Sequence, residues 1–133
     1  MKRDVYFGTL KLLGEEHRST VIAANNYAFS LLILHRYEEA KALLRKVMRV
    51  ARRVLGASHE STILMRWNYA RALSEDPAAT HGDLREAVNT LEETEQTARR
   101  VLGGAHPLTM GIGRDLQKSR AALRAHETPP SSA

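Results

Sequence analysis

Near the middle of the chain lies the stretch Val54-Leu55-Gly56-Ala57-Ser58-His59-Glu60-Ser61-Thr62, and this stretch decides the fold. Its pattern is an apolar residue followed by Leu-Gly-x-x-His-x-x-Thr, and residues 12–20 and 101–109 repeat that pattern. The glycines of the three copies are 42 and 47 residues apart. Self-similarity at such a period is typical of proteins built from stacked structural repeats.

The repeated stretch predicts the end of one helix and the start of the next. Gly14, Gly56 and Gly103 each follow an amphipathic run, and glycine takes the left-handed conformation that ends a helix without a Cβ penalty. The histidine three residues later stands where the next helix needs an N-cap. Pro107 suits a first helical position.

Two further matches fix the units between these stretches. Residues 26–28 (Asn-Tyr-Ala) recur 42 residues later at 68–70, and Tyr37-Glu38-Glu39-Ala40 recurs 47 residues later as Leu84-Arg85-Glu86-Ala87. Five extra residues therefore lie between Ala70 and Leu84, where Pro and Gly indicate a widened loop. We expect helices at about 3–13, 18–34, 37–55, 60–74, 83–102 and 107–126, and a disordered tail over 127–133.

The predicted helices differ in how apolar they are. The segment 37–55 has an apolar face and a basic face, as an amphipathic surface helix does. The segment 18–34 is apolar on nearly its whole circumference, which predicts a helix sandwiched between others. Ala28 and Ala40, repeated by Ala70 and Ala87, are small residues where helices would cross closely.

Composition supports an all-α chain. The sequence is 43% hydrophobic and only 5% aromatic, and Ala, Leu, Arg and Glu dominate it. Cysteine is absent, which excludes disulfides and Cys-based zinc sites. We see no signal peptide after Met1, and the most apolar stretch, 21–34, is too short and polar to cross a bilayer of about 30 Å. We therefore expect a cytoplasmic protein.

These residues resemble the tetratricopeptide repeat, in the 42-residue variety found in kinesin light chains. Residues 102–109 match that family's linker, Leu-Gly-x-x-His-Pro-x-Thr, and the likeness covers about residues 12–124. The resemblance implies a right-handed α-solenoid of antiparallel helix pairs with about six helices, filling one repeat domain over residues 1–126. Tyr27 and Tyr69 stand where Leu is usual, and His35 where Gly is usual.

The half repeats at the two ends depart further from the pattern. In the last one, Gln117 replaces a small residue, and Gly111 and Gly113 weaken the helix, so we expect a C-terminal cap. The chain opens inside what looks like the second helix of a repeat. That start favours a fragment, a truncated array, or a protein whose first helix caps the stack.

Nothing in the sequence predicts chemistry. His17, His59 and His106 fall in successive linkers, which stacked pairs hold on the order of 10 Å apart, too far for one metal ion. Catalytic triads, paired carboxylates and phosphate-binding loops are not recognisable. We predict no catalytic residue, no cofactor and no metal, and hence no enzyme.

The resemblance implies a protein-interaction scaffold that binds a short peptide or partner helix in the concave groove of the stack. Two alternatives to groove binding stay open. Phe29 and Trp67 could be core residues, and Asn25 and Asn68 could only join neighbouring helices. The partner is expected to be an acidic peptide, which Arg side chains would attract. The predicted groove residues are Asn25, Phe29 and Leu32 in segment 18–34, Leu64, Trp67, Asn68 and Arg71 in segment 60–74, and Arg114 and Lys118 in segment 107–126.

A second function remains as an alternative, namely binding of nucleic acid or an acidic surface to a basic convex face. The net charge of +5 favours it, but a solvated face is the simpler interpretation, since no aromatic residues for base stacking interleave with the cations. Exposed end helices would also allow end-to-end self-association. The residues of this basic convex face, called the convex basic stripe below, are Lys41, Arg45, Lys46, Arg49, Arg52 and Arg53.

Overall fold

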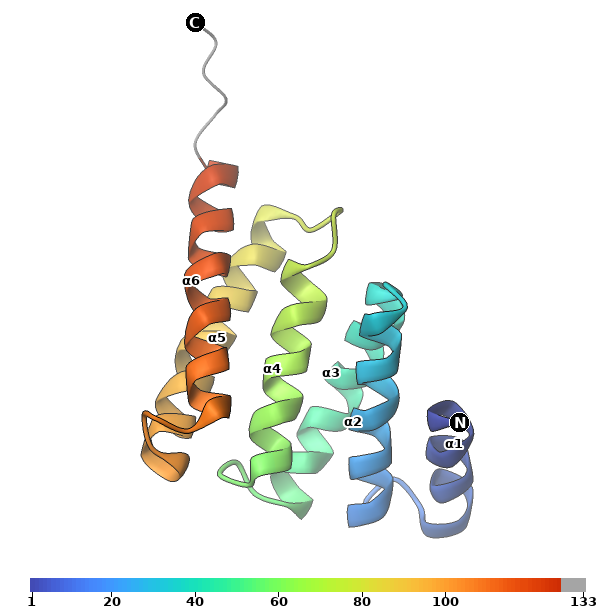
Figure 1. Cartoon of the computed structure of the whole chain (residues 1–133). Helices are drawn as coiled ribbons and strands as arrows, with labels where there is room; N and C mark the ends of the chain where they lie inside the picture. Colours follow the sequence, from blue (N-terminus) through green and yellow to red (C-terminus); the bar gives the residue numbers. More distant parts are fainter. Residues whose placement is uncertain (128–133) are drawn as a thin grey trace, which may run out of the picture.

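The computed structural model describes residues 1–127, and within them the chain forms six α-helices and no strand (Figure 1). The helices begin and end within two residues of the predicted bounds. Glu127, predicted to open a disordered tail, is the last residue of the sixth helix, and residues 128–133 of that tail lie outside the described residues. The helices are α1 (Lys2–Leu13), α2 (Arg18–Ile33), α3 (Tyr37–Val54), α4 (Glu60–Ser74), α5 (His81–Leu102) and α6 (Pro107–Glu127).

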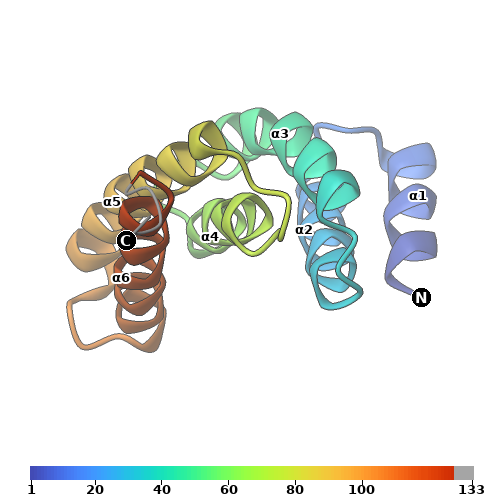
Figure 2. The ribbon, with the colours of Figure 1, turned by 90° about the horizontal axis from the view of Figure 1, so that it is seen from above.

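The helices form a curved two-layer stack, which confirms the predicted all-α solenoid. Each helix packs against the next one along the chain, and α4 also contacts both α2 and α6. Figure 2 shows α3 and α5 on the outer side of the arc and α2, α4 and α6 on the inner side. The first member of each helix pair therefore lines the inner face. None of the helices over residues 1–127 is long and apolar enough to span a membrane.

The linkers adopt the predicted conformation. Gly14, Gly56 and Gly103 have φ angles of 84°, 92° and 92°, in the left-handed region that favours glycine. The Nδ1 atoms of His17 and His59 each accept a hydrogen bond from the backbone N–H two residues later, at 3.0 Å. His106 accepts the same bond at 3.1 Å from Leu108. The histidines thus cap the three inner helices.

Two turns show how local chemistry sets the remaining boundaries. His35 has a φ of 59°, in the left-handed region that favours glycine. α5 begins two residues earlier than expected because Thr80 and Asp83 form a capping box, with Thr80 Oγ1 accepting from the Asp83 N–H at 3.1 Å and Asp83 Oδ2 accepting from the Thr80 N–H at 3.0 Å.

The core lies between the two layers. Ala28, Ala40, Ala70 and Ala87, the predicted close-crossing positions, are all completely buried. The expectation that α2 is sandwiched between other helices is confirmed, since α1, α3 and α4 all pack against it, but Ile33 is 62% exposed. α2 has only α1, α3 and α4 as neighbours, so its inner side stays open.

Candidate functional site

Each inner helix carries side chains that are exposed, on α2 and α6, or partly exposed, on α4. On α2 they form a stripe with the spacing i, i+4, i+7 and i+11, which places its residues on one side of a helix. Phe29 in this stripe is 43% exposed. We call these residues the inner surface: Ile22, Asn26, Phe29 and Ile33 on α2, Leu64, Trp67 and Arg71 on α4, and Arg114 and Lys118 on α6.

Phe29 and Arg71 join the inner-surface residues of α2 and α4. The guanidinium carbon of Arg71 lies 5.7 Å from the centre of the Phe29 ring, within cation–π range. Arg71 Nε also donates to Glu75 Oε2 at 2.8 Å. An aromatic ring, a cation and a carboxylate therefore share one part of the inner surface. The cation is already partnered there, so a ligand carboxylate would have to compete with Glu75.

Trp67 is held between α4 and α6. Its indole Nε1 donates to Asp115 Oδ2 at 2.6 Å. A Cβ placed on Gly111 would lie 2.5 Å from Cη2 of the indole, so the glycine is what lets the ring approach α6. Both alternatives for Trp67 are thus partly true, because the ring is half-buried against the core and still borders the inner surface.

Three predicted groove residues are buried, and for them the expectation of a free, ligand-facing side chain is wrong. Asn68 Nδ2 donates to Asn25 Oδ1 at 3.0 Å, and the two side chains are 2% and 5% exposed. The Asn pair therefore ties α2 to α4, which was the competing interpretation. Leu32 packs in a small apolar cluster with Ala40 and Ala72.

Two side-chain hydrogen bonds between inner helices follow the same register. In each case the residue nine positions after the capping histidine of one inner helix forms a hydrogen bond with the residue eight positions after the capping histidine of the preceding inner helix. Asn68 bonds Asn25 in this way, and Asp115 bonds Trp67. The geometry of stacking is thus repeated although the chemistry of the two contacts differs.

Arg114 and Lys118 carry positive charge on the last inner helix. Both are exposed, and within residues 1–127 neither forms an ion pair. Lys118 borders a surface hollow of about 370 Å³ that also includes Glu75 and Asp115. This part of the inner surface is therefore of mixed charge.

The convex basic stripe is partly neutralised. Lys41 pairs with Glu38 at 2.9 Å, and Arg53 pairs with Glu16 at 2.5 Å. Arg45 donates to the Tyr69 hydroxyl at 3.0 Å, and this bond raises the pKa of the Arg45 guanidinium. Half of the six predicted cations are thus engaged by neighbouring side chains, which weakens the case for a phosphate-binding face.

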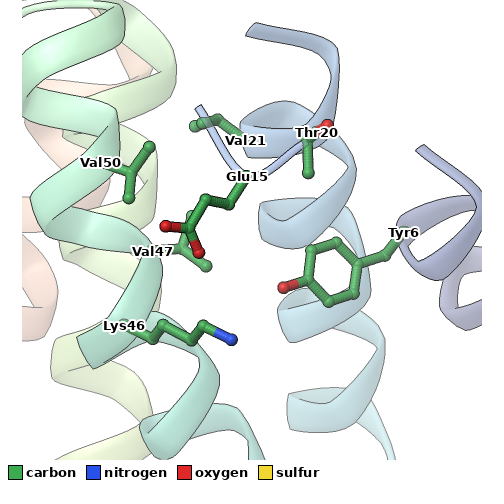
Figure 3. A pocket seen from close by; sticks show the side chains of 7 residues that line it. All are labelled: Tyr6, Glu15, Thr20, Val21, Lys46, Val47 and Val50. Carbon is green, nitrogen blue, oxygen red and sulfur yellow. The ribbon is translucent and has the colours of Figure 1, made fainter. Parts of the chain in front are cut away.

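One enclosed cavity among residues 1–127 is too small for a ligand. It measures about 10 Å³ and lies where α1, α2 and α3 meet, bordered by Tyr6, Glu15 and Lys46 among others (Figure 3). A cavity of that volume holds at most one water molecule. Burial raises the pKa of the Tyr6 hydroxyl there, and the Glu15 carboxylate adds to the effect. Among residues 1–127 no group of three or more His, Cys, Asp or Glu side chains is placed to hold a metal ion.

Sequence reasoning missed four residues of the site. Ile22, Asn26 and Ile33 share the helical stripe of Phe29, and that spacing was a usable signal. Asp115 had no local signal, because its partner Trp67 lies 48 residues away.

The chain was compared with known proteins. A family model described as tetratricopeptide repeat matches residues 19–76, a segment that runs from the first turn of α2 through α3 and α4. The match supports the predicted repeat class for that segment. No curated protein matches the chain.

Proposed function

We propose that this chain is a protein-interaction scaffold that binds a short acidic peptide along its inner surface. Tetratricopeptide repeats generally mediate contacts between proteins, and the family match supports that class of function. The observation that carries the proposal is the row of exposed apolar residues on α2, where Ile22, Phe29 and Ile33 are 36%, 43% and 62% exposed. Figure 2 shows α2 on the inner side of the arc. Exposed apolar side chains gathered on one face are typical of interaction surfaces.

The charge of the inner surface selects the kind of peptide. Arg114 and Lys118 on α6 have no carboxylate partner within residues 1–127, so a ligand carboxylate could satisfy them without breaking an existing pair. The chain as a whole carries a net charge of +5, which speeds the approach of an acidic ligand. The peptide would lay apolar side chains on Ile22, Phe29 and Ile33 and direct its carboxylates toward α6.

A pair of peptide pools tests this proposal. One pool alternates apolar residues with Glu, and the other has Lys at the same positions; binding is measured by fluorescence anisotropy. The acidic pool should bind and the basic pool should not. Phe29→Ala should weaken binding about tenfold, as loss of an interface anchor does. Lys118→Glu should weaken it roughly fivefold.

Arg49→Glu is the matched control, because it reverses a cation on the outer helix α3 and should leave binding unchanged. Equal binding of both pools, or an unaltered affinity in Phe29→Ala, would contradict the proposal. Trp67→Ala is not a suitable probe, since it would also remove the contact between α4 and α6.

We also infer that the repeat is of the kinesin-light-chain-like kind, because the capping residues His17 and His59 are 42 residues apart. A cytoplasmic location stays a prediction. End-to-end self-association is supported at one end more than at the other. On α6 the exposed residue Gln117 is polar, as in a cap, whereas α1 exposes Val5 and Leu12.

A further inference from the structure

α1 has an apolar face that no other part of the described chain covers. Met1, Val5 and Leu12 are 94%, 54% and 82% exposed, and with Gly8 they follow the spacing i, i+4, i+7 and i+11 along one side of the helix. A Cβ built on Gly8 would meet nothing within 4 Å. The neighbouring side of α1 packs on α2 through Tyr6, and Met1 and Val5 border a surface hollow whose other wall includes Leu31 and Leu34 at the end of α2.

The internal repeat shows what kind of element fits this face. α1 and α3 end at equivalent glycines 42 residues apart, so Val5 and Gly8 correspond to Val47 and Val50. In α3 those two valines are 6% and 7% exposed, and Figure 3 shows them facing Val21 of α2. The same face of α1 is therefore shaped to receive an antiparallel helix in the position that α2 takes against α3.

Charge identifies the occupant. Asp4 in the first turn and Lys11 in the last turn lie seven residues apart, at the same edge of the apolar face. When two identical helices pack antiparallel, equal edges meet and the first turn of one lies opposite the last turn of the other. Each Asp4, which lies 3.6 Å from the exposed N-terminal ammonium of its own chain, would then also face a Lys11 of the second copy, twice by symmetry.

We propose that two copies of this protein associate through α1, with the helices antiparallel about a two-fold axis near Gly8. Gly8 allows close approach at the crossing, while Val5 and Leu12 of each copy cover those of the other. The interface residues Val5, Gly8 and Leu12 are not among the residues of the inner surface.

Molar mass in solution tests the proposal. Light scattering after size exclusion, over a range of concentrations, should show a dimer that dissociates on dilution. Leu12→Asp should give a monomer with unchanged helicity, because the side chain is exposed. Met110→Asp is the matched control, since Met110 is an exposed apolar residue at the other end of the stack and its replacement should leave the dimer intact.

A charge exchange tests the antiparallel register. Asp4→Lys and Lys11→Asp should each weaken the dimer about tenfold, because each turns two attractive contacts into repulsive ones. The double variant should regain the original affinity. A monomer at every concentration, a dimer lost in Met110→Asp but kept in Leu12→Asp, or a double variant no better than the singles would overturn the proposal.

Discussion

The indole nitrogen of Trp67 donates a hydrogen bond to the carboxylate of Asp115 across 2.6 Å, and this bond joins the second and third inner helices. The ring reaches that position because residue 111 of α6 has no side chain. A glycine that weakens a helix when judged alone is thus the condition for the packing between α4 and α6.

Gly111→Ala should destabilise the protein by about 1–3 kcal/mol, because the new methyl group would collide with the indole. Gly113→Ala is the control on the same helix. There the new Cβ would meet only the end of the Glu95 side chain, which can rotate away, so the better helix former should be neutral or add up to about 1 kcal/mol. Urea unfolding gives both values. Trp67 emission should shift to the red only in Gly111→Ala.

The Asn25–Asn68 bond should behave as a buried, mutually dependent pair. Asn68→Ala should cost about 1–3 kcal/mol, because it leaves the buried Asn25 amide without its partner. The double variant Asn25→Ala/Asn68→Ala should cost less than the sum of the two single changes. A double-mutant cycle measures the difference, and strict additivity would mean that the two amides do not interact.

His59 should be replaceable only by another residue that accepts a hydrogen bond at the helix start. His59→Ala should lower the free energy of unfolding by about 1 kcal/mol, because the Ser61 N–H loses its acceptor. His59→Asn should restore most of that loss, since Asn is a favoured N-cap. Equal stability of the Ala and Asn variants in thermal unfolding would show that the cap is unimportant.

The capping box of α5 should make stability fall in acid. Hydrogen bonds from Thr80, the backbone N–H above all, hold the pKa of Asp83 below its ordinary value of 3.8. The contribution is therefore complete above that value and is lost as the pH falls through the lower pKa of the folded protein. Asp83→Asn should be less stable than the original protein at neutral pH, and the difference should vanish at low pH. Chemical unfolding at a series of pH values measures it.

The features that the sequence predicted best are those determined locally. A glycine with positive φ followed by a capping histidine needs only a few adjacent residues, and all three linkers were predicted correctly. The inner-surface residues were harder, because adjacent positions on a helix point about 100° apart. Asn26 is exposed and Asn25 is buried, and only the rotation of α2 against its neighbours decides between them.

Contacts between distant residues could not be predicted in the same way. The role of Gly111 depends on Trp67, and the bond to Asp115 depends on how two helices are stacked across a widened loop. Phe29 and Arg71 were both named from their positions, yet their contact with each other and the engagement of Arg71 by Glu75 emerge only from the packing.

The difference between the two junctions limits how this array could have grown. If a gene duplication inserted a second copy of residues 60–106, the duplicated Leu64 would occupy the place that Gly111 takes beside Trp67. The leucine side chain would then occupy the space of the indole ring. The lengthened chain would need a smaller residue at that position before it could fold as one continuous curved stack. The order of the units in this chain is therefore not freely interchangeable.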